Sequence, residues 1–549
     1  MPPKPSAPDA VRALRAAQAA EARGDAAEAL RRYGQVLARR PDDIEALARS
    51  GVLLGAQGAF AAAAERLERA TQLRPGDAES WLALAMAQLR LGQGPGAEAA
   101  ARRSLEAAAL DPRAWTVLGD SLADQGKREA SAAAYRRALE LRPDYAPALA
   151  NLAVVLAQLG RSAAAAAVLA KALAASPADA DMWRNLALLR AESGDAAGAL
   201  AAAEQVESLA PASGDAAVLR GEIAQRCGDV AGALAAFGAA LAAGGERPEI
   251  VAAQASLLQR AGRQSEAEGL LAAAADRHPA SAIIHFKLGE ALQRLGRSAA
   301  AIAAFERALA ADPADAAGAS LSLARLTGRI PARCPDAWVA RVFDLFADRF
   351  EQHLRGLDYR VPEHLAAMVA QSFAQGALGR LSVLDLGCGT GLCGAILRPL
   401  AARLDGIDLS PRMAAAALAR RVLGRTAYDA VDVGEAVSLL ADRAARYDAV
   451  VAADVLMYVG DVGPCLEAVA GALRPGGVFC FNVEGAGADE GEICLRASFR
   501  YAHRRDHVER RARDAGLEVE EAVEAELRAE AGHPIAGWLV RLRRPEQAG

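Results

Sequence analysis

The residues with the clearest chemical meaning lie in two short stretches in the last third of the chain. One holds Asp385, Gly387, Gly389 and Gly391, spaced Asp-x-Gly-x-Gly-x-Gly, and the other holds Asp408. Glycines let the backbone approach a ligand closely and turn sharply into a helix. An acidic residue before the first glycine suits a cationic group, and a carboxylate at the end of the next strand accepts both hydroxyls of a ribose. The two stretches therefore predict a site for a nucleoside that carries a positive charge.

The same loop does not fit the two common phosphate-binding patterns. A dinucleotide fingerprint requires a third glycine where Leu392 stands, and a phosphate-binding P-loop requires Gly-Lys-Ser or Gly-Lys-Thr, which is absent. A pyrophosphate ligand is therefore disfavoured.

The elements that position these residues are expected to alternate between strands and helices. Short apolar runs predict strands at 381–386, 403–408, 447–454 and 477–483, with helical periodicity between them. This order is typical of a doubly wound parallel sheet, whose ligand site lies at the carboxyl ends of the strands.

The spacing of Asp385, the three glycines and Asp408 resembles that of class I methyltransferases dependent on S-adenosylmethionine (SAM). Residues 428–435, 447–454 and 473–477 agree with the same family. The resemblance implies a Rossmann-like α/β domain over residues 332–545, with a seven-stranded sheet that ends in an antiparallel hairpin.

SAM is the cofactor that this resemblance implies. It places Asp385, Gly387 and Asp454 around the methionine end, Asp408 at the ribose, and Leu409, Met413 and Glu435 beside the adenine, with Cys388 and Gly389 in the pocket lining. Whether Asp432 or Glu435 reaches the adenine amine stays open. No metal site is expected.

The stretch from Phe343 to Pro362 resembles the helical lead-in of a bacterial group in which repeat arrays are fused to a methyltransferase. In that group the helix lies over the cofactor pocket as a lid. Residues 527–541 match the same group and should form the turn and last strand of the hairpin.

Methyl transfer mainly requires alignment of donor and acceptor, so a general base is optional. Tyr458 and His503 are the favoured candidates because they follow the fourth and fifth strands. The further candidates are His353, Tyr359, Glu484 and His507. The fourth strand ends in Ala-Asp-Val-Leu rather than Asn-Pro-Pro-Tyr, which weighs against methylation of amines on nucleic-acid bases.

The first three hundred residues repeat one unit. Nine glycines recur in unbroken steps of 34: Gly24, Gly58, Gly92, Gly126, Gly160, Gly194, Gly228, Gly262 and Gly296. A small residue stands seven positions before each glycine and a bulky one nine positions after most of them. These are the positions at which paired helices are expected to approach each other closely.

Tryptophan recurs at the fourth place of three copies, and proline closes most of them, which resembles the tetratricopeptide pattern. The resemblance implies nine helix pairs over residues 10–315, stacked as an α-solenoid in a right-handed superhelix. Residues 1–9 are expected to form a disordered tail, and residues 316–331 a capping helix and linker.

A groove along such a solenoid would bind a protein or peptide. Asn151 and Asn185 occupy the same place in adjacent copies, where each could hold a peptide amide of an extended ligand. The alternative is that asparagine is simply common at this place.

Charge and cysteine content exclude several classes. With 63 basic and 68 acidic residues, the chain lacks the broad positive surface that non-specific nucleic-acid binding requires. Seven cysteines without a CxxC pair favour a reducing compartment and argue against structural zinc. No run of about 18 apolar residues predicts a membrane span, so a cytoplasmic location is expected.

The sequence thus predicts a SAM-dependent methyltransferase whose repeats recruit the acceptor or a partner. Two alternatives stay open. The chain could be a scaffold whose domain binds SAM without catalysis, or an enzyme for a small-molecule acceptor whose repeats serve only assembly.

Overall fold

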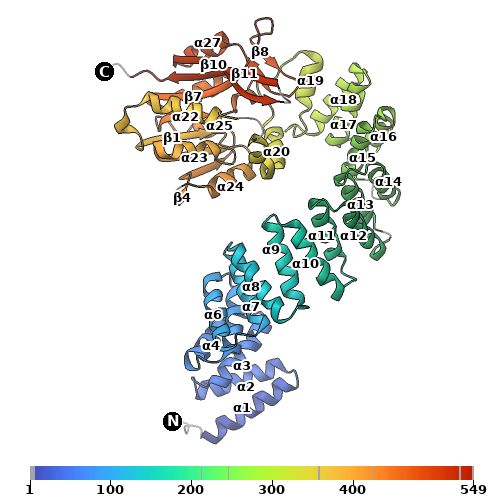
Figure 1. Cartoon of the computed structure of the whole chain (residues 1–549), viewed down its shortest axis with the longest axis vertical. Helices are drawn as coiled ribbons and strands as arrows, with labels where there is room; N and C mark the ends of the chain where they lie inside the picture. The colour runs from blue at the N-terminus through green and yellow to red at the C-terminus, as the bar shows by residue number, and fades with distance from the viewer. Residues whose placement is uncertain are drawn as a thin grey trace. The chain divides into compact units, whose positions relative to one another are not determined.

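The computed structural model describes residues 7–211, 213–244, 247–355, 359–422, 424–530 and 533–546. The chain forms two compact units, Met1–Glu246 and Arg247–Gly549. The first unit contains seven helix pairs, and the second contains two further pairs followed by an α/β domain (Figure 1). Helix α1 begins at Ala7, inside the predicted tail, and residues 1–6 lie outside the described residues.

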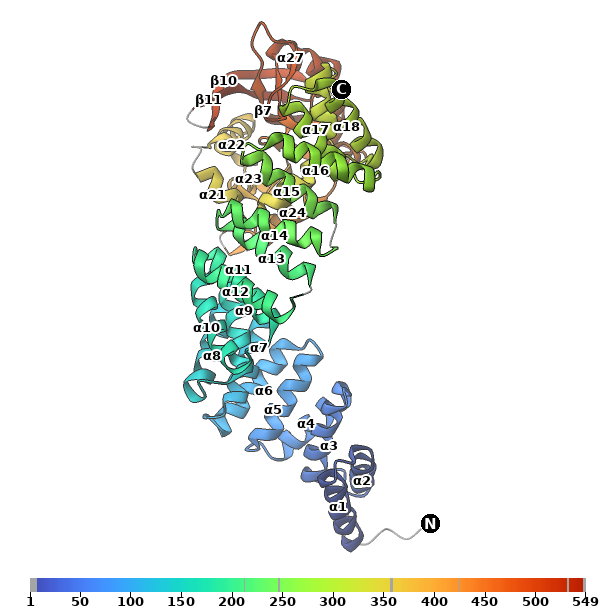
Figure 2. The ribbon, with the colours of Figure 1, turned by 90° about the vertical axis from the view of Figure 1, so that its right-hand side faces the viewer.

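The helix pairs follow the predicted period of 34 residues, and in each unit consecutive pairs stack on one another (Figure 2). The first unit comprises α1 (Ala7–Ala22), α2 (Ala26–Arg39), α3 (Ile44–Ala56), α4 (Phe60–Leu73), α5 (Ala78–Arg90), α6 (Gly94–Ala107), α7 (Pro112–Asp124), α8 (Arg128–Leu141), α9 (Ala146–Gln158), α10 (Ser162–Ala175), α11 (Ala180–Glu192), α12 (Ala196–Leu209), α13 (Gly214–Arg226) and α14 (Val230–Ala242). The second begins with α15 (Pro248–Arg260), α16 (Gln264–Arg277), α17 (Ala282–Arg294) and α18 (Ser298–Ala311).

The recurring glycines and small residues have separate physical reasons. All nine glycines have positive φ, from 70° at Gly92 to 83° at Gly194, so each ends the first helix of its pair in a left-handed conformation. The small residue seven positions earlier meets the bulky residue of the second helix. A Cβ on Gly119 would lie 2.5 Å from the Tyr135 ring. The close approach is thus between the backbone of one helix and a large side chain of the other.

The tryptophans at the fourth place tie each copy to the one before it. The indole nitrogens of Trp81, Trp115 and Trp183 donate to backbone carbonyls of the preceding turn at 2.8–2.9 Å. The Nε2 of His285, at the same place, lies 2.9 Å from the Pro279 carbonyl. These side chains are therefore structural.

The α/β domain is built on a mixed sheet whose main strand order is β10-β11-β7-β6-β1-β2-β5. The strands are β1 (Leu381–Leu386), β2 (Ala401–Asp408), β5 (Ala430–Val433), β6 (Tyr447–Ala452), β7 (Leu473–Gly485), β10 (Glu518–Glu530) and β11 (His533–Arg543). Strands β5, β2, β1, β6 and β7 are parallel, while β11 is antiparallel to both β7 and β10. The predicted seven-stranded sheet with an antiparallel hairpin is confirmed.

Two short strands extend the sheet beyond the prediction. Strand β9 (Tyr501–His503) pairs in parallel with the end of β7, and β8 (Ile493–Leu495) pairs with β9. A separate small hairpin joins β3 (Arg421–Val422) to β4 (Arg425–Thr426). The insertion of β8 and β9 places residues 493–503 beside the carboxyl end of β7.

Helices cover both faces of the sheet. One face packs against α22 (Val361–Ser372), α23 (Leu392–Leu397) and α24 (Pro411–Ala419). The other packs against α25 (Ala436–Leu440), α26 (Gly463–Ala472) and α27 (Arg505–Asp514). Strand β1, at the centre, is buried along its whole length, as a central parallel strand between two helical layers must be.

Before the sheet, α19 (Ala319–Thr327) follows the last pair. The lid segment then comprises α20 (Asp336–Phe346), η1 (Ala347–Arg349) and α21 (Phe350–Arg355), which include residues 343–355 of the predicted lid stretch. The remaining 3-10 turns are η2 (Gln375–Ala377), η3 (Arg398–Leu400) and η4 (Leu456–Tyr458). In the described part of the chain, no helix combines the length and apolar character needed to cross a membrane.

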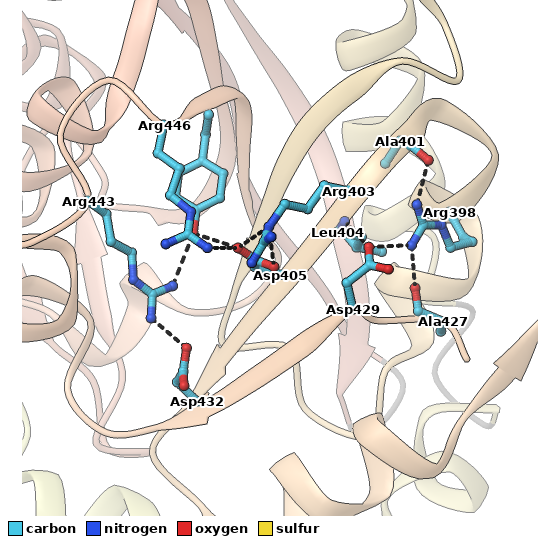
Figure 3. A network of polar contacts seen from close by, with 11 residues as sticks. Arg398, Ala401, Arg403, Leu404, Asp405, Ala427, Asp429, Asp432, Arg443 and Arg446 are labelled. Carbon is cyan, nitrogen blue, oxygen red and sulfur yellow. Dashed lines mark hydrogen bonds and ion pairs between the residues drawn. The ribbon is translucent and has the colours of Figure 1, made fainter. Parts of the chain in front are cut away.

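A closed polar network braces the sheet toward the amino ends of its strands (Figure 3). Asp405 of β2, only 1% exposed, accepts from Arg403 at 3.0 Å, Arg446 at 3.0 Å and the Tyr447 hydroxyl at 3.0 Å. Arg443 extends the network from Tyr447 to Asp432. Beside it, Asp429 accepts from the Leu404 amide and from a buried guanidinium, that of Arg398. The network joins β2, β5 and β6 through side chains.

Candidate active site

A cavity of about 400 Å³ opens at the carboxyl ends of β1, β2 and β6. Its lining includes seven of the residues predicted for the site: Gly387, Gly389, Asp408, Leu409, Glu435, Asp454 and Tyr458. Asp385, Cys388, Met413 and His503 are not among the lining residues. Topology thus brings together residues spread over more than seventy positions of sequence, where a doubly wound sheet is expected to bind its ligand.

The glycine loop between β1 and α23 has the open backbone that a ligand requires. Gly387, Gly389 and Gly391 all have positive φ, from 54° to 87°. A Cβ on Gly387 would lie 2.4 Å from the Val455 side chain. A Cβ on Gly389 would face the Phe350 ring of the lid at 3.7 Å. Glycine is therefore required both by conformation and by space.

Asp385, the last but one residue of β1, is fully buried beneath this loop. Its Oδ2 accepts from the Tyr428 hydroxyl at 2.7 Å, while its Oδ1 has no hydrogen-bond partner. Burial raises the pKa of this carboxyl to about 7, against the donated hydrogen bond of Tyr428. A buried carboxylate oxygen without a donor is costly. Because Asp385 is not among the cavity-lining residues, its charge would favour a cationic ligand at this end from beneath the loop rather than through an exposed contact.

Asp408 ends β2 and holds the glycine loop in place. Its two oxygens accept from the backbone amides of Gly389 and Ser410, each at 2.8 Å. Burial nevertheless raises its pKa. Leu409 follows it in the cavity wall, whereas Met413 is fully buried within α24.

Cys388 lies inside the loop but does not face the cavity. The thiol is 4% exposed, and burial raises its pKa. A thiol held in the neutral form is a poor nucleophile, so this residue packs against the loop.

Glu435 and Asp432, the two acidic residues considered for the adenine amine, are placed differently. Glu435 lines the cavity and caps α25, accepting from the amides of Val437 at 3.0 Å and Ser438 at 2.8 Å. It also pairs with Arg333 at 2.9 Å. Asp432 instead pairs with Arg443 in the network of Figure 3. Of the two, Glu435 is the one that a ligand can reach.

Asp454 adopts a left-handed conformation, with φ of 56°, just beyond the end of β6. Its side chain accepts from the amide of Asn482 at 2.6 Å, and its backbone amide donates back to that residue at 2.8 Å. A non-glycine residue with positive φ is strained, and such strain is concentrated at functional sites. The paired bonds to Asn482 hold this turn.

A charged cluster beside Asp454 was not foreseen from the sequence. Arg528 of β10 is 3% exposed and pairs with Asp454, Glu484 and Glu530. Arg500, on the inserted segment, pairs with Glu530 as well. Both arginines and Glu530 line the cavity. Two charged residues at alternate positions, Arg528 and Glu530, near the turn of the predicted hairpin are the sequence signal that indicates it.

The candidates for a general base fall into two groups, those that line the cavity and those that do not. Tyr458, His353 and Tyr359 line the cavity. Burial raises the pKa of Tyr458, although the neighbouring Arg500 lowers it. His503 is fully buried, lies 3.0 Å from the Gly460 carbonyl, and has its pKa lowered by burial to about 4. Glu484 and His507 are engaged elsewhere, with Arg528 and with Glu492. The structure does not bring His503 to the cavity.

The lid segment closes one side of the cavity with aromatic rings. Phe343, Phe346 and Phe350 all line it and contact one another edge to face at 6.0–6.2 Å through Phe350. The lid is fastened to α24, since Asp344 accepts from Ser410 and from the Arg412 amide, and Asp348 pairs with Arg412. These rings give that side of the cavity an apolar wall.

The two groove asparagines differ in their contacts. Asn151 donates to Asp120 at 2.8 Å, and Asp120 also accepts from the Tyr135 hydroxyl at 2.6 Å. Asn185 is exposed. Asn151 is thus already used within the array, and only Asn185 presents an exposed side chain.

Comparison with known families agrees with both parts of the fold. Residues 384–479 match the family model of a methyltransferase domain. Residues 54–120, 116–180 and 252–316 match models of the tetratricopeptide repeat. The chain is a fusion of these two kinds of structure.

Among curated proteins, the ubiquinone biosynthesis O-methyltransferases of Methylocella silvestris and Bradyrhizobium diazoefficiens are similar to this chain. They are 35% identical over 106 residues and 37% identical over 101 residues, which is 19% and 18% of this chain. The chain spans about two fifths of the length of these relatives, 41% and 39%.

Similar solved structures resemble the repeats. MamA from Desulfovibrio magneticus is 22% identical, with a TM-score of 0.29, over 30% of this chain and 93% of its own. YrrB, described as a tetratricopeptide protein with an unusual peptide-binding site, is 17% identical, with a TM-score of 0.29, over 33% of this chain and 92% of its own.

Proposed function

We propose that this chain, in which tetratricopeptide repeats are joined to a methyltransferase domain, transfers the methyl group of SAM to an acceptor that the repeats or a bound partner deliver. One observation carries the proposal. A buried, unpartnered carboxylate oxygen on Asp385 lies under a glycine loop, and Asp408 lies at the end of the adjacent strand. This donor set suits a nucleoside with a cationic tail better than it suits a phosphate.

Bound SAM would supply a methyl group on a positively charged sulfur. The residues present would hold its ends: Asp408 the ribose, Leu409 and Glu435 the adenine side, and Asp385 and Asp454 the methionine side. The lid rings of Phe343 and Phe350 would exclude water, which strengthens each of these electrostatic contacts.

On the acceptor side, Tyr458 acts as a hydrogen-bonding group. Because burial raises the pKa of its phenol, it stays protonated at neutral pH and orients an acceptor without removing its proton. His353 of the lid also lines the cavity and is the candidate base. The cytoplasmic location remains a prediction.

A second candidate function is methylation of a small molecule, with the repeats serving assembly. It is favoured by the similarity of the domain to O-methyltransferases of ubiquinone biosynthesis. The scaffold alternative is disfavoured because the glycine loop and Asp385, Asp408 and Asp454 are all intact.

Calorimetric titration with SAM and with its demethylated product tests the cofactor. We expect micromolar binding that Asp408→Ala abolishes and that Asp432→Ala, whose carboxylate faces Arg443 outside the cavity, preserves. Absence of binding by the unaltered protein would contradict the proposal. Transfer of labelled methyl groups in a lysate, followed by separate counting of the protein and small-molecule fractions, then distinguishes the two acceptor classes.

A further inference from the structure

The segment between α19 and the lid is hydrogen-bonded into the methyltransferase domain. The carbonyl of Ala332 accepts from the amides of Gly460 at 2.8 Å and Asp461 at 2.7 Å. The amide of Cys334 donates to the Tyr458 carbonyl at 2.9 Å, and Arg333 forms an antiparallel bridge with Val459. Residues 332–334, which directly follow the predicted linker, therefore lie along residues 458–461, the loop that carries Tyr458 into the cavity.

Side chains reinforce this backbone connection. The Tyr501 hydroxyl donates to the Pro331 carbonyl at 2.9 Å, and the Cys334 thiol donates to the Phe499 carbonyl at 3.4 Å. Leu321 of α19 lies in the same buried cluster as Cys334 and Tyr501. The cap of the repeats and the inserted strands β8 and β9 thus share one small core.

Trp338 is the residue of this core that contacts both the start of α19 and the cavity residue Tyr458. Its ring lies above Gly318, where α19 begins, so closely that a Cβ on Gly318 would be 2.8 Å from the indole. The same ring contacts Tyr458, with ring centroids 6.4 Å apart, and Phe499 at 6.0 Å. Phe343 of the lid packs on the other side of Tyr458 at 5.6 Å. One indole therefore separates the end of the repeats from the tyrosine in the cavity.

We propose that Trp338 is a positioning residue that couples the end of the repeat array to the acceptor-side loop at residues 458–461. A displacement of α19 moves the indole, and the indole moves Tyr458, because closely packed side chains transmit a shift that they have no space to absorb. The proposal deepens the proposed function, on which it rests for the meaning of the Tyr458 loop. It makes the last repeats part of the site rather than a separate docking module.

Helix α19 offers a matched pair of substitutions. Gly318 and Gly328 stand at its two ends with φ of 81° and 74°, so alanine brings similar backbone strain at both positions. Only Gly318 has the Trp338 ring above it, since a Cβ on Gly328 would meet nothing within 4 Å. Gly318→Ala pushes on the indole from the repeat side without touching the cavity, and Gly328→Ala is its control.

Hydrogen exchange of the full chain, measured by mass spectrometry, tests the coupling between α19 and residues 458–461, and it does not require a known methyl acceptor. In Gly318→Ala we expect the amides of Gly460 and Asp461 to lose protection by about tenfold, while in Gly328→Ala they keep it. Adding Trp338→Phe to Gly318→Ala should restore protection, because the smaller ring leaves room for the new methyl group. Equal loss in both single variants, or no rescue, would overturn the proposal.

SAM titration of the same variants separates this proposal from the proposed function. Failure of the unaltered protein to bind SAM refutes the cofactor assignment and leaves the exchange comparison intact. If SAM binds and Gly318→Ala changes neither the protection of residues 458–461 nor the methyl-transfer rate, the coupling is refuted and the cofactor assignment stands.

Discussion

Two buried aspartates on neighbouring strands differ in how their charge is balanced. Asp405 of β2 faces Arg403, Arg446 and the Tyr447 hydroxyl, all within 3.0 Å, on the side of the sheet covered by α25 and α26. Asp385 of β1 faces the other side, accepts one hydrogen bond from Tyr428, and keeps one oxygen without a partner.

The difference teaches where to look for a ligand in a sheet that buries several charges. A buried carboxylate whose charge is balanced by guanidinium groups, as that of Asp405 is, has little to gain from a cationic ligand. One that is left unsatisfied is destabilising by itself and gains most from a bound cation. Under the proposed function, the unpaired oxygen of Asp385, rather than burial or charge alone, would mark the end of the site that takes the cation.

Arg528 gives the strongest test of this comparison, because its charge is fully paired although it lines the cavity. It is 3% exposed and pairs with three carboxylates, of which Glu484 is 7% exposed. Arg528→Met removes the closest counter-charge of the buried Glu484 and of Asp454, while Glu530 keeps Arg500, so we expect the free energy of unfolding to fall by about 3–5 kcal/mol. Denaturant titration measures it. Arg500→Met, at a guanidinium 26% exposed, should cost less than about 1 kcal/mol, and an equal loss in both variants would contradict the distinction.

Asp405→Ala tests the fully paired cluster, which consists of Asp405, Arg403, Arg446 and Tyr447. It leaves the buried Tyr447 hydroxyl without its acceptor, while Arg403 and Arg446, 49% and 39% exposed, can still be hydrated. We expect a loss of about 2–3 kcal/mol in the free energy of unfolding and an unchanged affinity for SAM. Asp442→Ala, at an exposed position of the nearby loop, serves as the control. A weakened SAM affinity in folded Asp405→Ala would show that the two clusters are not independent.

The sequence predicts the repeats almost residue by residue because their signals are local. Each glycine in steps of 34 adopts a left-handed conformation at a helix end, and the small residues Gly51, Gly119, Gly221 and Gly289 each face a bulky side chain of the same copy. Both partners of each contact lie in one 34-residue copy at a fixed spacing, so the repeat pattern of the sequence predicts the contact.

The active site is predictable only in part, because its charges pair over long distances. The loop at 385–391 and Asp408 follow local rules, so their spacing in the sequence predicts where they lie in the fold. Arg528 meets Asp454 from 74 residues away, through an antiparallel hairpin and the inserted strands, and no local pattern reports that contact. The sequence favours His503 for its position after the fifth strand, but His503 ends a further short strand, β9, which pairs with β7, and its ring is buried against Gly460.

Asp385→Asn tests the aspartate that keeps an unpaired oxygen, and its expected effect on free energy is smaller. The amide oxygen can still accept from Tyr428, and removal of a buried, unpaired charge should leave the free energy of unfolding unchanged or slightly raised. Affinity for SAM should fall about thirtyfold, or ~2 kcal/mol, because the negative charge that favours the cation is lost. Calorimetry and denaturant titration on the same sample measure the two effects. A large loss of stability with unchanged affinity would show that Asp385 serves folding, as Asp405 is expected to do, and not ligand binding.

The pH dependence of SAM binding should be the mildest sign of the same difference. Burial raises the pKa of Asp385 from 3.8 to about 7, so in the free protein the carboxyl takes up its proton as the pH falls below that value. A cationic ligand prefers the ionised form, and affinity should fall about tenfold between pH 8 and pH 6. For folding the sign is opposite: a raised acidic pKa makes stability decline as the pH rises from about 4 to 7. Asp385→Asn should remove both trends while Asp405→Ala removes neither, and pH-independent binding by the unaltered protein would place the cation away from Asp385.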